Sequence, residues 1–525
     1  MLSSSLVMFA CAVLPLALLL LGLLRLRWSA PKAGAVAWLS AMLVALLVFG
    51  SNPVSLALSN AKGMSLTLFV ALIIWSSVFL YNLVENSGAV KAISARVTSL
   101  VKEPLLQCLL LAWCVSGFIQ GIAGFGVPVA IVAPLMLVVG FSPITAAVAT
   151  LVGHAWSISF GSMAASFYTL TLVTRLPGNE AAFWMGAMLF APTLLSGFAV
   201  AHIYGGLDAV KKGAPAILLI GIAMGGTQWL VPALGAPQVG AILAGLAGTI
   251  VTVLVSRLGL VKEEAREQAK GTQQTAQMGE KLAFLPYYVL VTLTLFVQIP
   301  FVKSVTGHLK FGLSFPQMAT SLGYVVSAER AYAAIGLLSH PAPLILLSAF
   351  AAFLAYRITG NLRPGGLASA AAITYKQCVP TTVSIASMVM MALVMNDSGM
   401  TSSLAQGVAS ATGRLFPLFS PFIGVLGCFM TGSNTNSNVL FGAFQVETAV
   451  TLGISTRIMA AVQSAGGSLG SAIAPAKVLI GSTTVGLSGK ENSVMKKAIP
   501  YCVAIVAVVG AIAWLSAYVL FPKVL

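Results

Sequence analysis

The residues in this sequence that are best suited to chemistry form a run of hydroxyl and amide side chains inside an apolar segment. Residues 430–442 read MTGSNTNSNVLFG, and each of residues 433–438 is Ser, Asn or Thr. These side chains donate and accept hydrogen bonds without carrying charge. The positive end of the helix predicted to follow them also favours a small anion. The residues that we expect to hydrogen-bond its hydroxyl and carboxylate groups are Ser433, Asn434, Thr435, Ser437 and Asn438.

A second interruption of the apolar pattern is rich in glycine. Residues 121–128 read GIAGFGVP and follow Gln120. Because glycine lacks a Cβ, the backbone itself can approach a ligand. Gln120, Gly121, Gly124 and Gly126 are therefore predicted to belong to the same substrate site. The alternative interpretation is that each break is a kink or a packing motif, since Gly and Ser are common in membrane helices.

Four further polar residues are candidates for this site. His154 could relay protons, because histidine titrates near neutral pH, or it could be a satisfied polar residue between helices. Lys477 could pair with a carboxylate or replace a coupling cation, because an intramembrane lysine needs a partner. Alternatively, its ammonium group reaches the cytoplasmic interface. Gln463 and Ser464 are predicted to face the second break.

The composition predicts an integral membrane protein. Of 525 residues, 58% are apolar and 8% are charged, and the mean hydropathy is +0.98. The net charge of +16 is scattered between apolar segments, which indicates helix orientation and not nucleic-acid binding. The sequence has no C-x-x-C, no H-E-x-x-H and no P-loop. We therefore expect no metal, no cofactor and no enzymatic activity, with membrane lipids as the surroundings.

Helices of about 20 apolar residues are needed to cross the hydrocarbon core. The first such run precedes Arg25, Arg27 and Lys32, which predicts a retained helix whose C-terminal end is cytoplasmic. Glu85 and Asp397 end predicted spans and are expected at the interface. The candidate spans lie near 6–24, 35–58, 64–84, 144–170, 181–204, 214–231, 237–256, 283–302, 341–358, 378–396, 456–487 and 498–520.

Residues 105–140 and 415–452 do not fit as simple spans, because each half of each region is too short for a comfortable crossing. We predict two re-entrant hairpins, the first inserted from the cytoplasmic side and the second from the outside. This arrangement places most basic loop residues in the cytoplasm, including Lys211, Lys212, Lys496 and Lys497.

The two interrupted regions are related in sequence. A shift of 313 residues lays Gly140 on Gly453 and Ser142 on Ser455. Oppositely inserted hairpins in two related halves are typical of inverted-repeat secondary transporters, whose site forms where the broken elements meet. The predicted fold is therefore an all-α polytopic membrane protein with about 12 transmembrane helices plus two re-entrant hairpins in two inverted repeats. Its predicted parts are a first membrane half (1–257) with hairpin 105–140, a cytoplasmic linker (258–282) and a second half (283–525) with hairpin 415–452.

Several stretches together resemble the bacterial L-lactate permease family. They include FLYNLVENSG (79–88), GFIQGIAGFGVPVAI (117–131), SPFIGVLGCFMTGSNTNSNVLFGAFQVETA (420–449) and AAVQSAGGSLGSAIAPAK (460–477). The resemblance covers nearly the whole chain in the same order. It implies proton-coupled uptake of L-lactate, glycolate or a related 2-hydroxy monocarboxylate across the bacterial inner membrane. At greater distance it implies an elevator-type transport domain that slides against a scaffold, usually within a homodimer.

This sequence departs from the family pattern at positions that bear on coupling. Where the family usually shows a glutamate before the glycine-rich break, this chain has Gln120, and where it shows an aspartate at the second tip, this chain has Asn434. The usual family lysine falls on Ser471, whereas Lys477 appears six residues later. A buried carboxylic acid is the usual proton carrier. His154 and Lys477 are therefore the candidates for coupling, and the alternative function is a sodium-coupled or uncoupled carrier of another organic anion, such as a dicarboxylate.

A channel and an intramembrane enzyme are the competing classes. A channel would need a continuous polar pore, whereas the polar cluster here is small and flanked by apolar sequence. An enzyme would need a nucleophile or a metal constellation, and the sequence has none.

Overall fold

The computed structural model describes residues 2–124, 126–261, 278–306, 308–338 and 340–522. Within these residues, eleven helices are long and apolar enough to cross a membrane. The number rises to twelve when the bent pair Pro143–Ser157 and Gly161–Thr174 is taken as one span. The structure confirms the predicted all-α polytopic membrane protein. Most of the predicted linker 258–282 lies outside the described residues.

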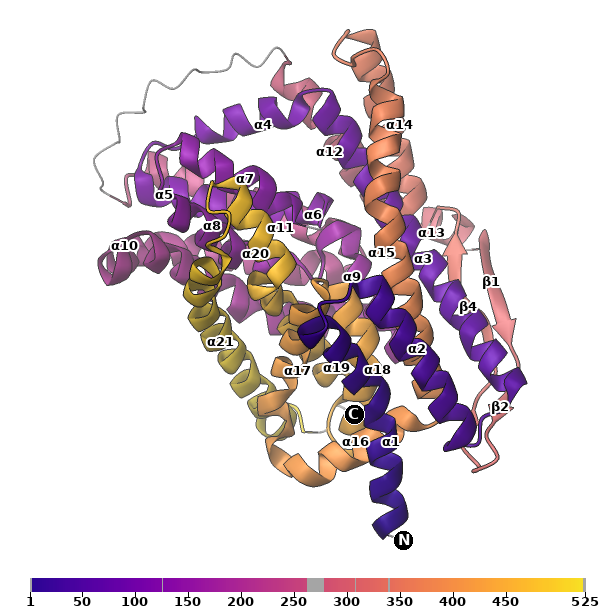
Figure 1. The fold of residues 1–525 in the computed structure, drawn as a ribbon. Helices are drawn as coiled ribbons and strands as arrows, with labels where there is room; N and C mark the ends of the chain where they lie inside the picture. Colours follow the sequence, from indigo (N-terminus) through magenta and orange to yellow (C-terminus); the bar gives the residue numbers. More distant parts are fainter. Residues whose placement is uncertain (1, 125, 262–277, 307, 339, 523–525) are drawn as a thin grey trace.

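The first half of the chain is helical throughout its described regular elements (Figure 1). They are α1 (Leu2–Leu20), α2 (Ala30–Leu47), α3 (Pro53–Asn86), α4 (Ala89–Thr98), α5 (Pro104–Leu109), α6 (Ser116–Ile122), α7 (Val127–Val138), α8 (Pro143–Gly153), α9 (Gly161–Thr174), α10 (Gly178–Ala233) and α11 (Pro237–Arg257).

The second half adds a small β region to its helices. Its elements are α12 (Glu280–Val297), α13 (Pro300–Thr306), β1 (Lys310–Phe315), β2 (Met318–Ala319), β3 (Val325–Val326), β4 (Glu329–Gly336), α14 (Pro341–Ile358), α15 (Gly366–Asp397), α16 (Met400–Thr412), α17 (Phe416–Thr431), α18 (Asn434–Leu452), α19 (Thr456–Gly470), α20 (Pro475–Thr484) and α21 (Glu491–Leu515).

The boundary between α2 and α3 corrects the predicted span 35–58, which ran through it. Asn52 caps α3, since its side chain accepts a hydrogen bond from the Ser55 backbone N–H at 2.8 Å. Ser55 Oγ accepts one from the Asn52 backbone N–H at 3.0 Å, and Pro53 occupies the first helical position. This capping box begins a new helix within the predicted span.

The β region was not predicted. β1 pairs with β4 and β2 pairs with β3, both antiparallel. In Figure 1 these strands lie beside α3, and β4 packs against that helix. The β region therefore extends one flank of the helical bundle.

Two groups of helices pack around the interrupted regions. α15 packs against α2 and α3, and α14 packs against α3 and α12. In the other group, α17, α18 and α19 pack on one another, α9 packs on α18, and α10 and α21 pack on α19. Both groups combine elements from both halves of the chain.

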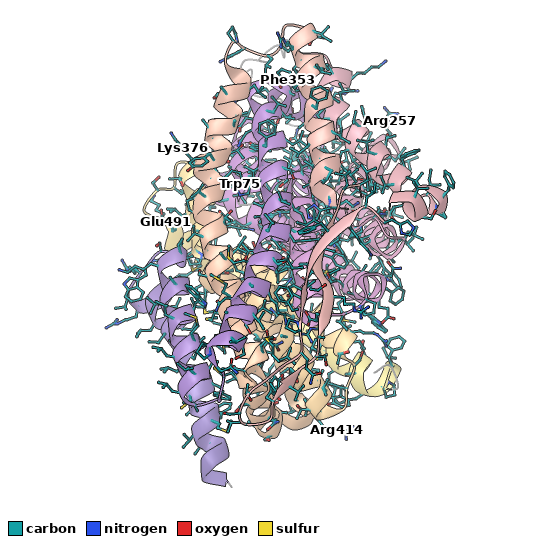
Figure 2. All side chains as sticks on the ribbon, turned by 90° about the vertical axis from the view of Figure 1, so that its right-hand side faces the viewer. Trp75, Arg257, Phe353, Lys376, Arg414 and Glu491 are labelled. Carbon is teal, nitrogen blue, oxygen red and sulfur yellow. The ribbon has the colours of Figure 1, made fainter. Side chains whose placement is uncertain are left out.

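Several basic residues lie toward one end of the molecule. α4, which carries Lys91 and Arg96, lies at the end opposite to α16 and β2 (Figure 1). Figure 2 shows Arg257 and Lys376 in the upper half of the molecule and Arg414 near the lower end. We use "cytoplasmic end" for the end at which α4 lies; that orientation is the one predicted from loop charge.

Two equivalences of the 313-residue shift have the same local structure. Gly140 and Gly453 both have positive φ, 91° and 66°. Ser142 and Ser455 both cap the next helix, accepting a hydrogen bond from the backbone N–H three residues later. The full repeat and the re-entrant insertion of the two regions stay predictions.

Candidate functional site

Each interrupted region has a tip where one helix ends and the next begins. Between α6 and α7, Gly126 has φ of 87°, and between α17 and α18, Gly432 has φ of 71°. Both values lie in the left-handed region that favours glycine. Ser433 then caps α18, because its Oγ accepts a hydrogen bond from the Asn436 backbone N–H at 3.4 Å. The positive end of the α18 dipole is thereby placed at the polar tip.

The helices that follow the two tips are broken midway, although 144–170 and 456–487 were predicted as simple spans. α8 and α9 are separated at residues 154–160 and bend by 49°, and α19 and α20 are separated at residues 471–474. The first break contacts α19: Ser159 Oγ lies 2.9 Å from Ser464 Oγ, and the Ser468 hydroxyl donates to the Ala155 carbonyl. The centre of the site is thus a crossing of two broken helices.

The second tip packs onto this crossing through its amide side chains. The Asn434 amide donates to Ser159 Oγ and Ser464 Oγ, both at 3.3 Å. The Asn438 amide donates to Ser464 Oγ at 3.1 Å and to the Ser166 carbonyl at 3.0 Å. Thr435 Oγ1 lies 3.0 Å from Ser166 Oγ. The structure therefore brings Asn434, Asn438, Thr435 and Ser464 together.

Ser437 and Gln463 are close to the cluster, but their hydrogen bonds are used within the protein. The Gln463 amide donates to Ser437 Oγ at 3.0 Å, and the Ser437 hydroxyl donates to the Gly424 carbonyl at 2.8 Å. Gln463 Oε1 accepts from the Gln445 amide at 3.1 Å. This geometry fits a supporting role for both residues.

The glycine-rich tip packs beside the broken helix α8–α9. A Cβ at Gly124 would collide with Ser162 Oγ, and a Cβ at Gly161 would collide with the Gln120 amide. Gln120 is buried there. Gly121 instead faces α11, where a Cβ would collide with Ile242. The absence of side chains at these glycines therefore permits close packing at this tip. Gly121, however, does not face the second tip.

His154 and Lys477 are both buried near the helix breaks. His154 ends α8, and its Nδ1 lies 2.6 Å from the Thr150 carbonyl. The Lys477 ammonium group donates to Ser471 Oγ, so the side chain points back toward the break. Its head group thus lies at the residue where the family pattern expects a lysine. Among the described residues, the ion pairs do not include Lys477.

A cavity of about 420 Å³ lies between the two tips, α20 and the facing helices α3 and α15. Of the predicted site residues, Ser433 and Lys477 line it, whereas Asn434, Ser464 and His154 lie outside the lining. Lys477 is the charged residue of the lining, which consists of Ala30, Pro31, Ile74, Val78, Tyr81, Ala123, Val127, Gln377, Cys378, Pro380, Thr381, Ser384, Thr431, Gly432, Ser433, Asn436, Ala476, Lys477 and Ile480.

Asn436 was not among the predicted site residues, although it belongs to the same polar run. Gln377, Thr381 and Ser384 were also missed, because α15 reads as an ordinary apolar span around them. Ser159 and Ser166, which hold the second tip, were missed because isolated serines are common in membrane helices.

Several buried acceptors around the tips lack a donor among the described residues. They are Gln120 Oε1, His154 Nε2, Asn434 Oδ1, Asn436 Oδ1 and Asn438 Oδ1. Buried polar atoms are nearly always hydrogen-bonded in folded proteins. A group of acceptors without donors suits a ligand that brings donors or positive charge, such as a hydroxyl group or a cation.

A second polar cluster, which was not predicted, lies where α3, α15 and β4 meet. Lys62 Nζ lies 3.2 Å from Asp397 Oδ2 and 3.6 Å from Glu329 Oε1. The Ser59 hydroxyl donates to Asp397 Oδ2 at 2.9 Å, and Arg175, after α9, pairs with Glu329. Asp397 does end its helix as expected, but its side chain is buried in an ion pair.

Broken helices that enclose polar side chains within a polytopic bundle are the arrangement of a membrane permease. The family model described as L-lactate permease matches residues 8–520. An L-lactate permease of Escherichia coli (strain K12) is 30% identical over 97% of this chain and 96% of its own length. The glycolate permease GlcA of the same strain and an L-lactate permease of Bacillus subtilis (strain 168) are each 27% identical, over 97% of this chain and 95% of their own length.

The chain therefore belongs to the L-lactate permease family. It is a permease and not an enzyme, and it is a multi-pass protein of the bacterial inner membrane. This confirms the family predicted from the residues around the two tips.

Proposed function

We propose that this permease takes up L-lactate or a related small 2-hydroxy monocarboxylate such as glycolate. The relatives' names, L-lactate permease and glycolate permease, support this substrate class. The observation that carries the proposal is the cavity between the tips, in which Lys477 is the charged lining residue. One cation in a mostly neutral cavity matches an anion with a single carboxylate.

The proposed binding mode uses the two kinds of polar group at the second tip. The carboxylate pairs with Lys477 and with the N-terminal end of α18, which both favour negative charge. The 2-hydroxyl donates to an acceptor such as Asn436 Oδ1, which lacks a donor in the described structure. A substrate without this hydroxyl would leave that acceptor unpaired, which costs affinity.

The proposed transport step is an elevator-type movement of the helices that carry the two tips. The cavity is bounded on one side by the tips and α20, and on the other side by α3 and α15. Displacement of the first group along the second would carry the bound anion across the membrane.

Proton symport is the proposed coupling, with His154 and Lys477 as the candidate groups. The runner-up is sodium coupling or uncoupled transport of another organic anion. It is favoured by the amides at positions 120 and 434 and by the unpaired amide oxygens, since Na⁺ is held by neutral oxygen ligands.

The substrate site is tested by uptake of labelled L-lactate into proteoliposomes. Lys477→Ala is expected to reduce uptake by at least tenfold, because a hydrogen bond to a charged group is lost. Lys376→Ala is the matched control, because Lys376 lies exposed on α15 outside the cavity lining, and it should leave uptake unchanged. Unchanged uptake by Lys477→Ala contradicts the proposed site.

The coupling ion is tested with the same proteoliposomes under imposed pH or sodium gradients. Uptake that disappears when the proton gradient is removed supports proton symport, whereas dependence on sodium alone supports the runner-up. Asn434→Asp restores the family carboxylate and is expected to strengthen the dependence on the proton gradient.

A further inference from the structure

A second cavity, of about 610 Å³, lies between α8, α10 and α21 and shares no lining residue with the first. Its lining comprises Ile144, Thr145, Val148, His202, Ile203, Lys496, Lys497, Pro500, Tyr501 and Ala504. Neither the substrate site nor the transport step proposed above uses these residues.

The polarity of this cavity changes along its helices. On α21, Lys496 and Lys497 come first, Tyr501 follows one turn later, and Ala504 lies about another turn along. The Tyr501 hydroxyl lies 2.8 Å from His202 Nδ1, so α10 contributes to the same polar end. The cavity therefore has a basic, hydrogen-bonding end and an apolar end.

The basic end faces the cytoplasmic end of the molecule. α21 begins at Glu491, which Figure 2 shows in the upper half of the molecule, as it does Arg257 and Lys376. Lys496 and Lys497 follow within two turns, at the end of α21 that loop charge predicts to be cytoplasmic. Among the described residues, neither lysine belongs to an ion pair.

We propose that this cavity binds an anionic phospholipid of the cytoplasmic leaflet. The headgroup phosphate pairs with Lys496 and Lys497 and accepts a hydrogen bond from the Tyr501–His202 pair. An acyl chain lies along the apolar end, past Val148 and Ala504. Basic pockets between membrane helices on the cytoplasmic side bind anionic headgroups through the same combination of charge and apolar contact. A free phosphate ester would use the basic end and leave the apolar end empty.

The test measures binding of dioleoylphosphatidylglycerol to the delipidated protein in detergent by native mass spectrometry. Dioleoylphosphatidylcholine and glycerol 3-phosphate are titrated in parallel. We expect the phosphatidylglycerol to bind more tightly than either. Lys496→Gln with Lys497→Gln should weaken it about 25-fold, because each basic residue near the surface contributes about fivefold. Lys211→Gln with Lys212→Gln removes two exposed lysines outside the cavity and should leave binding unchanged.

Ala504→Phe is the second variant, because it fills the apolar end and keeps both lysines. It should weaken phosphatidylglycerol binding and leave glycerol 3-phosphate binding unchanged. Equal affinity for phosphatidylcholine overturns the proposal, as does full binding by Ala504→Phe. Glycerol 3-phosphate binding as tight as that of the lipid assigns the basic end to a soluble ester and also overturns it.

Discussion

The polar cluster around Asn434 and the charged cluster around Lys62 differ in how completely their groups are paired. In the second cluster, Lys62 has two carboxylate partners, and Asp397 also accepts a hydrogen bond from Ser59. In the first, the amide groups of Asn434 and Asn438 donate, but their oxygens have no donor among the described residues. In the charged cluster each charge has an opposite charge nearby, although Glu329 Oε2 accepts no hydrogen bond among the described residues. In the neutral cluster the amide oxygens have neither a donor nor a charged partner there.

This difference supports a structural role for the charged cluster and the proposed binding role for the neutral cluster. Buried charges are tolerated only when partners offset their desolvation, so the charged cluster fixes the contact between α3 and α15. Free buried acceptors cost stability unless a ligand or water satisfies them. Substitutions should therefore affect mainly stability in the cluster around Lys62 and mainly transport in the cluster around Asn434.

The largest expected effect is that of Lys62→Ala on stability. Removal of Lys62 leaves Asp397 buried without its cation, which should lower the free energy of unfolding by about 3–5 kcal/mol. The measurement is thermal or chemical unfolding in detergent. Lys62→Met combined with Asp397→Leu is the control, and it should recover most of the loss because no charge is left unpaired. Wild-type stability of the single variant would refute the structural role of the pair.

Asn436→Ala is expected to affect transport more than stability. Asn436 lines the cavity and its Oδ1 has no donor among the described residues, so its removal should change the free energy of unfolding by less than about 1 kcal/mol. The apparent KM for lactate should rise about tenfold, the equivalent of one hydrogen bond. The matched control is Asn438→Ala, which loses two donated hydrogen bonds and should destabilise the protein by about 1–3 kcal/mol. If Asn436→Ala destabilised the protein more than Asn438→Ala does, the proposed difference between a substrate-binding and a supporting asparagine would be wrong.

Arg175→Gln probes the outer margin of the charged cluster. The Arg175 side chain is 45% exposed and Glu329 is 15% exposed. Solvent screens such a pair, so the loss should be about 1 kcal/mol in unfolding experiments, well below that of Lys62→Ala. A loss as large as that of Lys62→Ala would show that the four charges act as one unit.

The smallest effect is expected for Arg96→Gln. The pair Arg96–Glu280 joins α4 and α12 at 3.1 Å, but the two side chains are 49% and 58% exposed. The free energy of unfolding should change by less than about 0.5 kcal/mol, and lactate uptake should stay unchanged. A clear loss of stability would mean that exposed pairs matter here as much as buried ones.

The sequence predicted the tips because a local pattern marks them. Hydroxyl and amide residues at 433–438 and glycines at 121–126 interrupt long apolar runs, and the structure ends helices at both places. The helix breaks at residues 154–160 and 471–474 were missed, since both stretches lie within long, mostly apolar runs that read as continuous spans. Pro475, at the first position of α20, was a local signal for the second break.

The charged cluster could not be predicted, because its partners are far apart in the chain. Lys62 and Asp397 are separated by 335 residues, and the sequence around either residue does not indicate its partner. Asp397 lies at the end of an apolar segment, which favoured an interfacial location. Only the packing of α3 against α15 brings the pair together.

The contact between Ser468 and Ala155 bears on where an internal two-fold axis would pass. These two residues are 313 apart, which is the shift predicted to relate the two halves of the sequence. A residue and its counterpart in an internal two-fold can touch only near the rotation axis. Under that register, Ala155 and Ser468 would mark an internal two-fold axis inside the group of helices that the proposed elevator-type movement displaces.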